Sequence, residues 1–419
     1  MAATIMPDHA YFRNVPTVAF NRFPTFACLN NTHLELKPFI PVFMMIYLLM
    51  ASTSLAQPAG PLSKKNFSVE AKFEYGFLLS HHLELDVFKA HFPAIEISLQ
   101  KETWGSKRWE EEYAYPSLGV SIWMSNLGGF KEIGNAFALY PFINFPLMRH
   151  RENSVHFKIG IGAAYLTNHF DRIENYKNFA IGSAFNLAAS LYFDYKLQIS
   201  KRLSFSVGFG LTHFSNGSTK TPNYGLNVFT ATTGITYYLN KPHPYMKKKL
   251  LPRHYPFEFD GSKFLEMQVS TAVASKDMTE QLGERFMVYA VFTNIMARVG
   301  YKSKFGLGVD YTYDESDSYL IKRDKGFEPN LRDATKVGIN FAYELVLDRT
   351  SFLFNAGMYV AGKERSEGDF FQRLTLKYHI TDLWFANMAL SAHLGKAEYI
   401  GLGIGHRIPI KYRQRIPHD

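Results

Sequence analysis

From residue 66 onward, bulky apolar residues alternate with small or polar ones over many short stretches of the chain. A period of two is the spacing of a β-strand with two unlike faces. The stretch 203–215 shows it well, with Leu203, Phe205, Val207, Phe209 and Leu211 in one row and Ser204, Ser206, Gly208, Gly210 and Thr212 in the other. Apolar residues outside and small polar ones inside are typical of a transmembrane β-barrel. We therefore predict an all-β fold, an antiparallel transmembrane β-barrel.

The alternation predicts two series of strands. The first is expected at 67–80, 92–102, 114–125, 134–147, 153–166, 182–199, 202–215 and 225–239, and the second at 263–276, 284–299, 304–314, 334–347, 351–362, 370–380, 384–394 and 397–408. These counts fit either one barrel of roughly 14 to 16 strands or two successive barrels of about eight. The pattern leaves both arrangements open.

The chain is expected to fall into four parts. Residues 1–56 form a signal peptide region, 57–240 an eight-stranded barrel unit, 241–256 a basic, proline-rich linker, and 257–419 a second strand-rich half. The signal lies in the apolar block PFIPVFMMIYLLMASTSLA, which follows Lys37 and ends in small residues, so cleavage is expected after Ala56. An N-terminal anchor helix is the alternative interpretation of that block.

Composition removes several classes of function. No stretch after residue 56 has the ~20 consecutive apolar residues of a membrane helix, which excludes a helical membrane protein. The one cysteine, Cys28, precedes the expected cleavage site, so disulfides, thiolate catalysis and cysteine-held metals are not expected, and no cofactor is implied. The net charge of +9 is spread over strand ends and turns without a nucleic-acid motif. Such a surface suits anionic lipid, so we expect no nucleic acid partner.

Connection lengths predict an orientation. The connections near 149–153 and 200–202 are short, whereas those at 167–181 and 216–224 are long, as periplasmic turns and extracellular loops are. With a periplasmic N-terminus the seventh strand ends outside the cell. His213 and Ser215 continue its apolar row, and Asn227 faces the same way on the next strand, so all three are expected at the outer leaflet. Polar groups on a lipid-facing surface cost free energy, so their presence there indicates a function.

These residue types can perform acyl transfer. Two side chains at positions i and i+2 of a strand lie about 6.5 to 7 Å apart on one face. His213 can therefore reach Ser215 and remove its proton, while Asn227 can hold the other ring nitrogen as the third group of a hydrolase triad does. Asn216 and the backbone N–H groups of Gly217 and Ser218 lie beside the serine and can stabilise an oxyanion.

The segment HFSNGSTKTPNYGLN resembles the signature of the outer-membrane lipid A 3-O-deacylases, or acyloxyacyl hydrolases. In that family of eight-stranded barrels a His-x-Ser-Asn segment is followed by Lys, Pro-Asn and Gly at the same distances. Here these residues are His213, Ser215, Asn216, Lys220, Pro222, Asn223 and Gly225. The wider context, FPAIEISL, YPSLGVS, YPFINFPL and GIGAAYLT, is similar to long, two-part members of the Bacteroidota type.

The resemblance implies an enzyme of the outer membrane that hydrolyses an ester-linked hydroxyacyl chain of lipid A. Ser215 would be the nucleophile, His213 the base and Asn216 part of the oxyanion hole. Lipid A or lipopolysaccharide would be the substrate, and both a single chain and a homodimer are compatible with the sequence. The short enzymes of the family carry a glutamate where this chain has Asn227. A non-catalytic barrel acting as a pore or scaffold, and an outer-membrane phospholipase, are the alternatives.

A second, altered copy of the motif, LSAHLGKAEYIGLGIG, occurs near the end of the chain. There the apolar row is Met388, Leu390, Ala392 and Leu394, which places His393 on the inward face, and Gly395 stands where a serine would be needed. We expect this copy to be structural.

Overall fold

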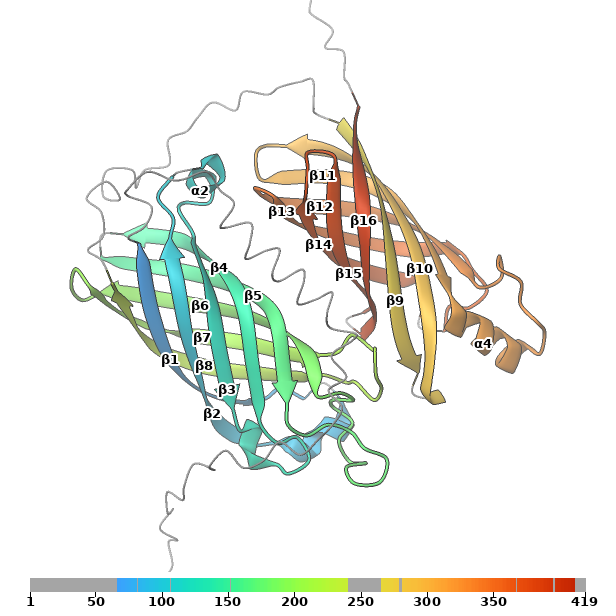
Figure 1. Cartoon of the computed structure of the whole chain (residues 1–419), viewed down its shortest axis with the longest axis horizontal. Helices are drawn as coiled ribbons and strands as arrows, with labels where there is room; N and C mark the ends of the chain where they lie inside the picture. The colour runs from blue at the N-terminus through green and yellow to red at the C-terminus, as the bar shows by residue number, and fades with distance from the viewer. Residues whose placement is uncertain are drawn as a thin grey trace, which may run out of the picture. The chain divides into compact units, whose positions relative to one another are not determined.

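The structure is a computed structural model that describes residues 66–410, except 81, 106, 151, 240–264, 279–280, 367 and 395. The expected signal region, Cys28 and the linker 241–256 lie outside the described residues. Within them the chain forms two closed antiparallel barrels of eight strands each (Figure 1). This decides between the two arrangements that the alternation left open.

The strands of the first barrel follow one another in chain order. They are β1 (Phe67–Leu78), β2 (His91–Glu102), β3 (Ser117–Ser125), β4 (Ala136–His150), β5 (Asn153–Leu166), β6 (Phe185–Gln198), β7 (Leu203–Ser215) and β8 (Leu226–Tyr238). The barrel closes where β1 pairs with β8, with Val69 opposite Tyr237. Closure leaves no strand edge without a partner, as a barrel in a bilayer requires.

The second barrel is built in the same way. Its strands are β9 (Leu265–Met278), β10 (Gln281–Val299), β11 (Ser303–Asp314), β12 (Thr335–Leu347), β13 (Thr350–Ala361), β14 (Phe370–His379), β15 (Trp384–His393) and β16 (Lys396–Ile410). Pairing of β16 with β9 closes it, with Ile408 opposite Met267. The predicted strand ends differ from the observed ones by at most three residues.

Four short helices lie in those connections that the structure describes, and the alternation predicted none of them. They are η2 (Leu83–Phe88), α2 (Arg108–Glu112), η3 (Leu127–Gly129) and α4 (Glu315–Lys325). In the described ranges no helix has both the length and the apolar character needed to cross a membrane.

The two faces of β7 differ as its alternation predicted. Phe205, Val207 and Phe209 are exposed, whereas Ser204 and Ser206 are buried in the barrel interior. The same outward-apolar row occurs on the other strands of the first barrel, for example at Phe73 on β1 and Ile97 on β2. The outer surface therefore has the apolar character of a lipid-facing barrel.

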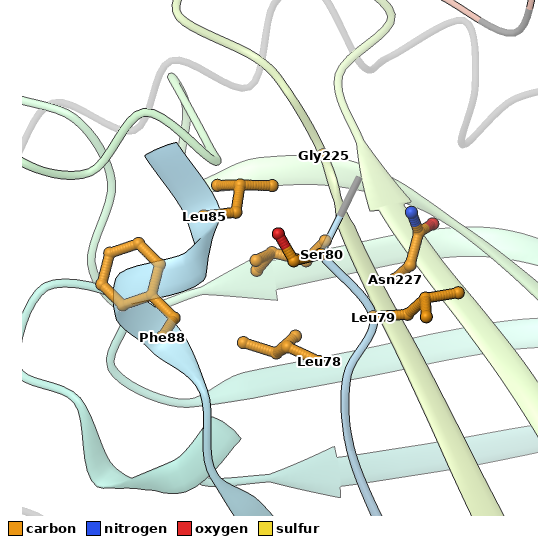
Figure 2. Close-up of a pocket in the computed structure, with 8 residues that line it drawn as sticks. Leu78, Leu79, Ser80, Leu85, Phe88, Gly225 and Asn227 are labelled. Atoms are coloured by element: carbon orange, nitrogen blue, oxygen red, sulfur yellow. The ribbon is translucent and has the colours of Figure 1, made fainter. Parts of the chain in front are cut away.

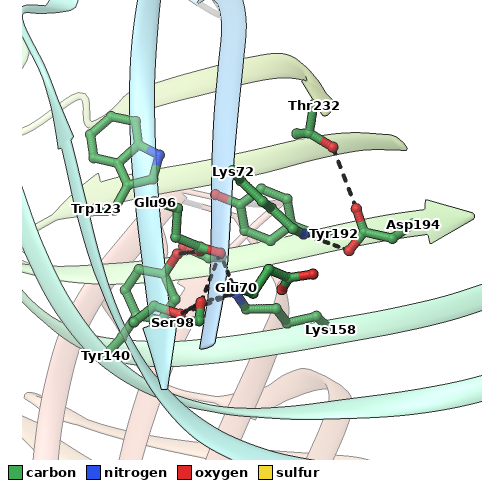
Figure 3. Close-up of polar contacts among 12 residues, drawn as sticks. Glu70, Lys72, Glu96, Ser98, Trp123, Tyr140, Lys158, Tyr192, Asp194 and Thr232 are labelled. Atoms are coloured by element: carbon green, nitrogen blue, oxygen red, sulfur yellow. Dashed lines mark hydrogen bonds and ion pairs between the residues drawn. The ribbon is translucent and has the colours of Figure 1, made fainter. Parts of the chain in front are cut away.

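Ion pairs and large aromatic rings fill the interior of the first barrel (Figure 3). The Lys72 ammonium donates to Asp194 at 2.6 Å, and the Lys158 ammonium donates to Glu96 at 2.5 Å. Trp123, Tyr140 and Tyr192 are completely buried around these pairs. Buried charges are tolerated when they are paired and hydrogen-bonded, and both of these pairs meet that condition.

The interior of the second barrel is also filled by paired charges. Lys304 donates to Glu266 at 2.7 Å, and the Arg373 guanidinium pairs with Asp310 while lying 3.6 Å above the ring centre of Phe292. The two lumens are thus built from different residues with the same chemistry.

Candidate active site

His213 and Asn227 are cross-strand partners at the ends of β7 and β8. The Nδ1 atom of His213 lies 2.6 Å from Oδ1 of Asn227. Because an amide oxygen can only accept, the imidazole donates through Nδ1–H. In the neutral ring this leaves Nε2 with a lone pair, which is the form that a general base needs.

Gly225 allows the imidazole to occupy this place. Its φ is +79°, in the left-handed region that favours glycine. A Cβ atom built on Gly225 would lie 2.8 Å from Cε1 of His213, closer than real Cβ atoms approach. Both the backbone conformation and the contact with the ring therefore require glycine here.

Two N–H groups converge on the Ser215 hydroxyl. The backbone N–H of Gly217 donates to Oγ at 3.1 Å, and the side-chain amide of Asn223 donates to it at 3.2 Å. These donors lie close to the position at which an oxyanion would form on a carbon bonded to Oγ. The pair is therefore a candidate oxyanion site for a tetrahedral intermediate.

The Asn216 side chain binds the loop instead of pointing at the serine. Its amide donates to Oγ of Ser183 at 2.9 Å and to the carbonyl oxygen of Lys220 at 2.8 Å. Its backbone N–H donates to Oδ1 of Asn223 at 3.2 Å. Asn216 thus orients Asn223, while the neighbouring Ser218 forms the turn with a φ of +62°.

Asn223 is a candidate functional residue that strand periodicity does not predict. It lies in an irregular loop, where a period of two says nothing about the direction of a side chain. The available signal was its place in the Pro222-Asn223 pair of the motif. Of the expected oxyanion donors, the structure brings the backbone N–H of Gly217 to the serine.

The β5–β6 connection packs against the β7–β8 connection. A Cβ atom on Gly182 would lie 2.5 Å from the carbonyl oxygen of Lys220 and 2.8 Å from that of Pro222, so only glycine fits.

In the same pair of connections, burial lowers the pKa of His169 below its usual value, and the nearby Lys220 lowers it further. His169 is therefore neutral at physiological pH.

An apolar pocket adjoins Asn227 (Figure 2). It is lined by Leu78, Leu79, Ser80, Leu85, Phe88, Gly225, Leu226 and Asn227. Six of these eight residues carry no polar side-chain atom, and with a volume of about 10 Å³ the pocket is too small to hold an acyl chain. Among the residues that the structure describes, no three His, Cys, Asp or Glu side chains are placed to hold a metal ion.

The histidine of the second motif copy lies in the interior of the second barrel. His393 is buried, with Nε2 3.1 Å from Oε2 of Glu398 and Nδ1 3.0 Å from the carbonyl oxygen of Phe370. Ser391 also donates to Glu398, at 3.3 Å. Since both ring nitrogens face an acceptor, His393 is held in a polar network.

Two family models match the chain. Residues 94–236 match the lipid A 3-O-deacylase (PagL) model, and residues 265–411 match the model of the acyloxyacyl hydrolase C-terminal domain. None of the curated proteins matches this chain.

Similar solved structures include two outer-membrane proteins. The crystal structure of the outer membrane enzyme PagL is 14% identical with a TM-score of 0.29, and the match covers 39% of this chain and 97% of that one. Neisserial surface protein A is 7% identical with a TM-score of 0.30, and the match covers 41% of this chain and 97% of that one.

Proposed function

The chain belongs to the lipid A 3-O-deacylase (PagL) family of the outer membrane, and from this we propose that it hydrolyses one ester-linked hydroxyacyl chain of lipid A with Ser215 as the nucleophile. The observation that carries the proposal is the contact of 2.6 Å between His213 and Asn227, beside a serine that receives two N–H donors. Together these supply an oriented base, a nucleophile and an oxyanion site.

In the proposed reaction His213 accepts the Ser215 proton at Nε2 while Oγ attacks the ester carbonyl carbon. The carbonyl oxygen becomes an oxyanion that accepts from the N–H of Gly217 and the amide of Asn223. The intermediate collapses when the C–O bond to the sugar breaks, and His213 gives its proton to the leaving sugar oxygen. Water then attacks the acyl carbonyl carbon while His213 takes one of its protons. The bond between this carbon and Oγ breaks, His213 returns the proton to Oγ of Ser215, and the hydroxy fatty acid leaves.

The neighbourhood of the site suits a lipid substrate. The outward faces of the strands that carry it are apolar, with Phe209 on β7 and Phe229 on β8 exposed. On a barrel that lies in the outer membrane with its N-terminus in the periplasm, the end of β7 would meet the outer leaflet, where lipopolysaccharide is found. The acyl chain would then reach the serine without leaving the membrane.

The test uses detergent-solubilised protein with purified lipopolysaccharide or phospholipid, followed by mass spectrometry of the lipids. Ser215→Ala should abolish acyl release and still migrate as a heat-modifiable barrel, because a serine at a strand end contributes little to folding. Ser200→Ala, in the β6–β7 turn at the other end of the barrel, is the matched control and should be fully active. Full activity of Ser215→Ala would show that Ser215 is not the nucleophile.

The same assay separates the two alternatives. Loss of one acyl chain from lipid A supports a deacylase, whereas fatty acid released from phospholipid supports a phospholipase with the same triad chemistry. Release from neither, with ion conductance in planar bilayers, would favour a pore.

A further inference from the structure

Tyr224 lies in the chain between two residues that touch the reactive groups. Asn223, on one side, donates to Oγ of Ser215 at 3.2 Å. Gly225, on the other side, lies against the imidazole of His213, so that an added Cβ would be 2.8 Å from Cε1. Interactions that hold the backbone of Tyr224 in place therefore also hold Asn223 against Ser215 and Gly225 against His213.

The ring of Tyr224 stacks on two other aromatic rings. His82 stacks on it with a centroid distance of 4.3 Å and an interplanar angle of 20°, and Phe179 with 6.3 Å and 23°. We refer to His82, Tyr224 and Phe179 as the ring stack. Its members come from the β1–β2, β7–β8 and β5–β6 connections, so it joins three loops that are distant in sequence. Stacked rings with offset faces attract one another and fix their relative orientation.

Backbone hydrogen bonds also connect the loops of the ring stack to the site. Tyr224 N–H donates to the carbonyl oxygen of Phe179 at 3.2 Å, and Gly225 N–H donates to that of Ala180 at 2.9 Å. Two residues later, the carbonyl oxygen of Asn227 accepts from the N–H of Leu79 at 2.8 Å. The segment that presents Asn227 to His213 is therefore tied to both neighbouring connections.

His82 is itself held in place. Its carbonyl oxygen accepts from the Ser80 hydroxyl at 2.7 Å and from the N–H of Leu85 at 3.0 Å, at the start of η2. Tyr224 packs against the buried apolar cluster that contains Leu85 and Leu226. The ring stack thus packs against the barrel core.

We propose that Tyr224 is a positioning residue for the hydrolysis, which holds Asn223 against Ser215 and Gly225 and Asn227 against His213 through the ring stack. This inference rests on the proposed function. Removing the ring would let the two contacts relax together, and displacement of catalytic groups by about 1 Å can cost up to about 100-fold in rate.

The experiment compares Tyr224→Ala with Tyr224→Phe in the full-length protein, on lipopolysaccharide and with a fluorophosphonate probe that labels an activated serine. Tyr224→Ala should lower kcat by about 10- to 100-fold with little change in KM, and should slow Ser215 labelling by a similar factor. Tyr224→Phe keeps the stacked ring and should restore both rates. Tyr176→Ala, an exposed tyrosine of the β5–β6 connection, is the matched control and should leave both unchanged.

If Tyr224→Ala loses the heat-modifiable fold, His82→Ala and Phe179→Leu each remove one partner ring of Tyr224 with less disruption. Each should slow labelling several-fold. The double variant should slow labelling by less than the product of the two single factors, because both substitutions act through the same ring. Folded variants that label Ser215 at the normal rate would overturn the inference.

Failure of the inference and failure of the proposed function give different results. If Ser215→Ala is inactive while Tyr224→Ala is fully active, only the positioning role is wrong. If Ser215→Ala is itself active, the proposed function is wrong.

Discussion

Asn227 accepts the N–H of His213 through a neutral oxygen, where short members of the family are expected to have a carboxylate. The contact of 2.6 Å holds the ring in one tautomer, which is the orienting part of a triad's third member. A neutral amide supplies less of the other part, the stabilisation of the imidazolium that forms as Ser215 attacks. Substitutions at position 227 can therefore separate the effect of orienting the His213 ring from the effect of a negative charge beside it.

Asn227→Ala should lower kcat by on the order of 10² or more, because the tautomer and the ring orientation are no longer fixed. Asn227→Glu should keep or raise kcat, since a carboxylate stabilises the imidazolium. Near the membrane interface such a charge costs only about 0 to 1 kcal/mol. Kinetics of the three proteins on one lipid A substrate check this. An inactive Glu variant beside an active Ala variant would remove Asn227 from the triad.

Strand periodicity was sufficient to predict that His213 and Asn227 face the same way. Both lie on regular strands, where every second side chain shares a face, and the pairing of β7 with β8 puts them opposite one another. The same periodicity could not predict that Asn223 reaches Ser215 or that Asn216 binds Ser183 and Lys220 instead. Those contacts depend on the path of a loop with left-handed residues at Gly217 and Ser218.

Among the elements, α4 shows what the alternation missed. Asp314 caps the N-terminus of the helix, where its side chain accepts from the N–H of Ser316, and Gly326 caps the C-terminus with a φ of +71°. Both are ordinary helix-end signals. The segment between them has few apolar residues, so no periodic stripe marks it as a helix. The strands, by contrast, carry long alternating rows, and their ends were predicted within three residues.

Asp317 ties α4 to the second barrel, and its titration should make the helix sensitive to pH. Burial raises the pKa of Asp317, Lys336 at 3.0 Å lowers it and Asp314 raises it, so that the pKa is about 7. In an unfolded chain the same carboxyl titrates near pH 4. The docked helix therefore binds the proton more tightly, and its stability is greatest below about pH 4 and falls as the pH rises to about 7.

Hydrogen–deuterium exchange of the α4 amides, corrected for the intrinsic pH dependence, measures this effect. Protection should decrease between about pH 4 and 7, by at most about tenfold per pH unit for one proton. Asp317→Asn cannot titrate and should flatten the profile. Asp324→Asn changes an exposed carboxylate of the same helix and is the matched control. A profile that Asp317→Asn leaves unaltered would assign the sensitivity to another group.

For the whole molecule, a period of two cannot specify which strands pair at closure. The alternation is the same whether β8 pairs with β1 or with a ninth strand, so one barrel of roughly 14 to 16 strands remained open. The pairing of Val69 with Tyr237 and of Met267 with Ile408 divides the chain into two barrels. The histidines of the two motif copies then lie in different barrels. Of the two, His213 is on an outward strand face and His393 is in the interior.

His213→Ala should reduce deacylation by orders of magnitude, whereas His393→Ala should leave it within a few fold. The reason is that His393 lies inside the second barrel, bound to Glu398 and to the carbonyl oxygen of Phe370. Because the substitution leaves Glu398 buried with fewer partners, rates are normalised to the amount of heat-modifiable protein. Comparable losses at both positions would give the second barrel a part in the reaction.

Neither barrel should conduct ions, because each lumen is filled. In the first, Trp123, Tyr140 and Tyr192 are completely buried around the Lys72–Asp194 and Lys158–Glu96 pairs. In the second, Arg373, Lys377 and Phe385 are buried in the same way. Opening a path for hydrated ions means separating buried ion pairs, and leaving one such charge without its partner costs about 3 to 5 kcal/mol.

Planar bilayer recordings at equal protein density check this expectation, with a sixteen-stranded porin as the positive control. The wild-type chain should give no steady conductance steps. Replacing Trp123, Tyr140 and Tyr192 together by Ala removes the rings from the first lumen, so this variant should leak if it folds. Regular ohmic steps from the wild-type protein would contradict the filled lumen and would favour a pore over the esterase, since a barrel built only to hold a lipid-facing site has no need of a channel.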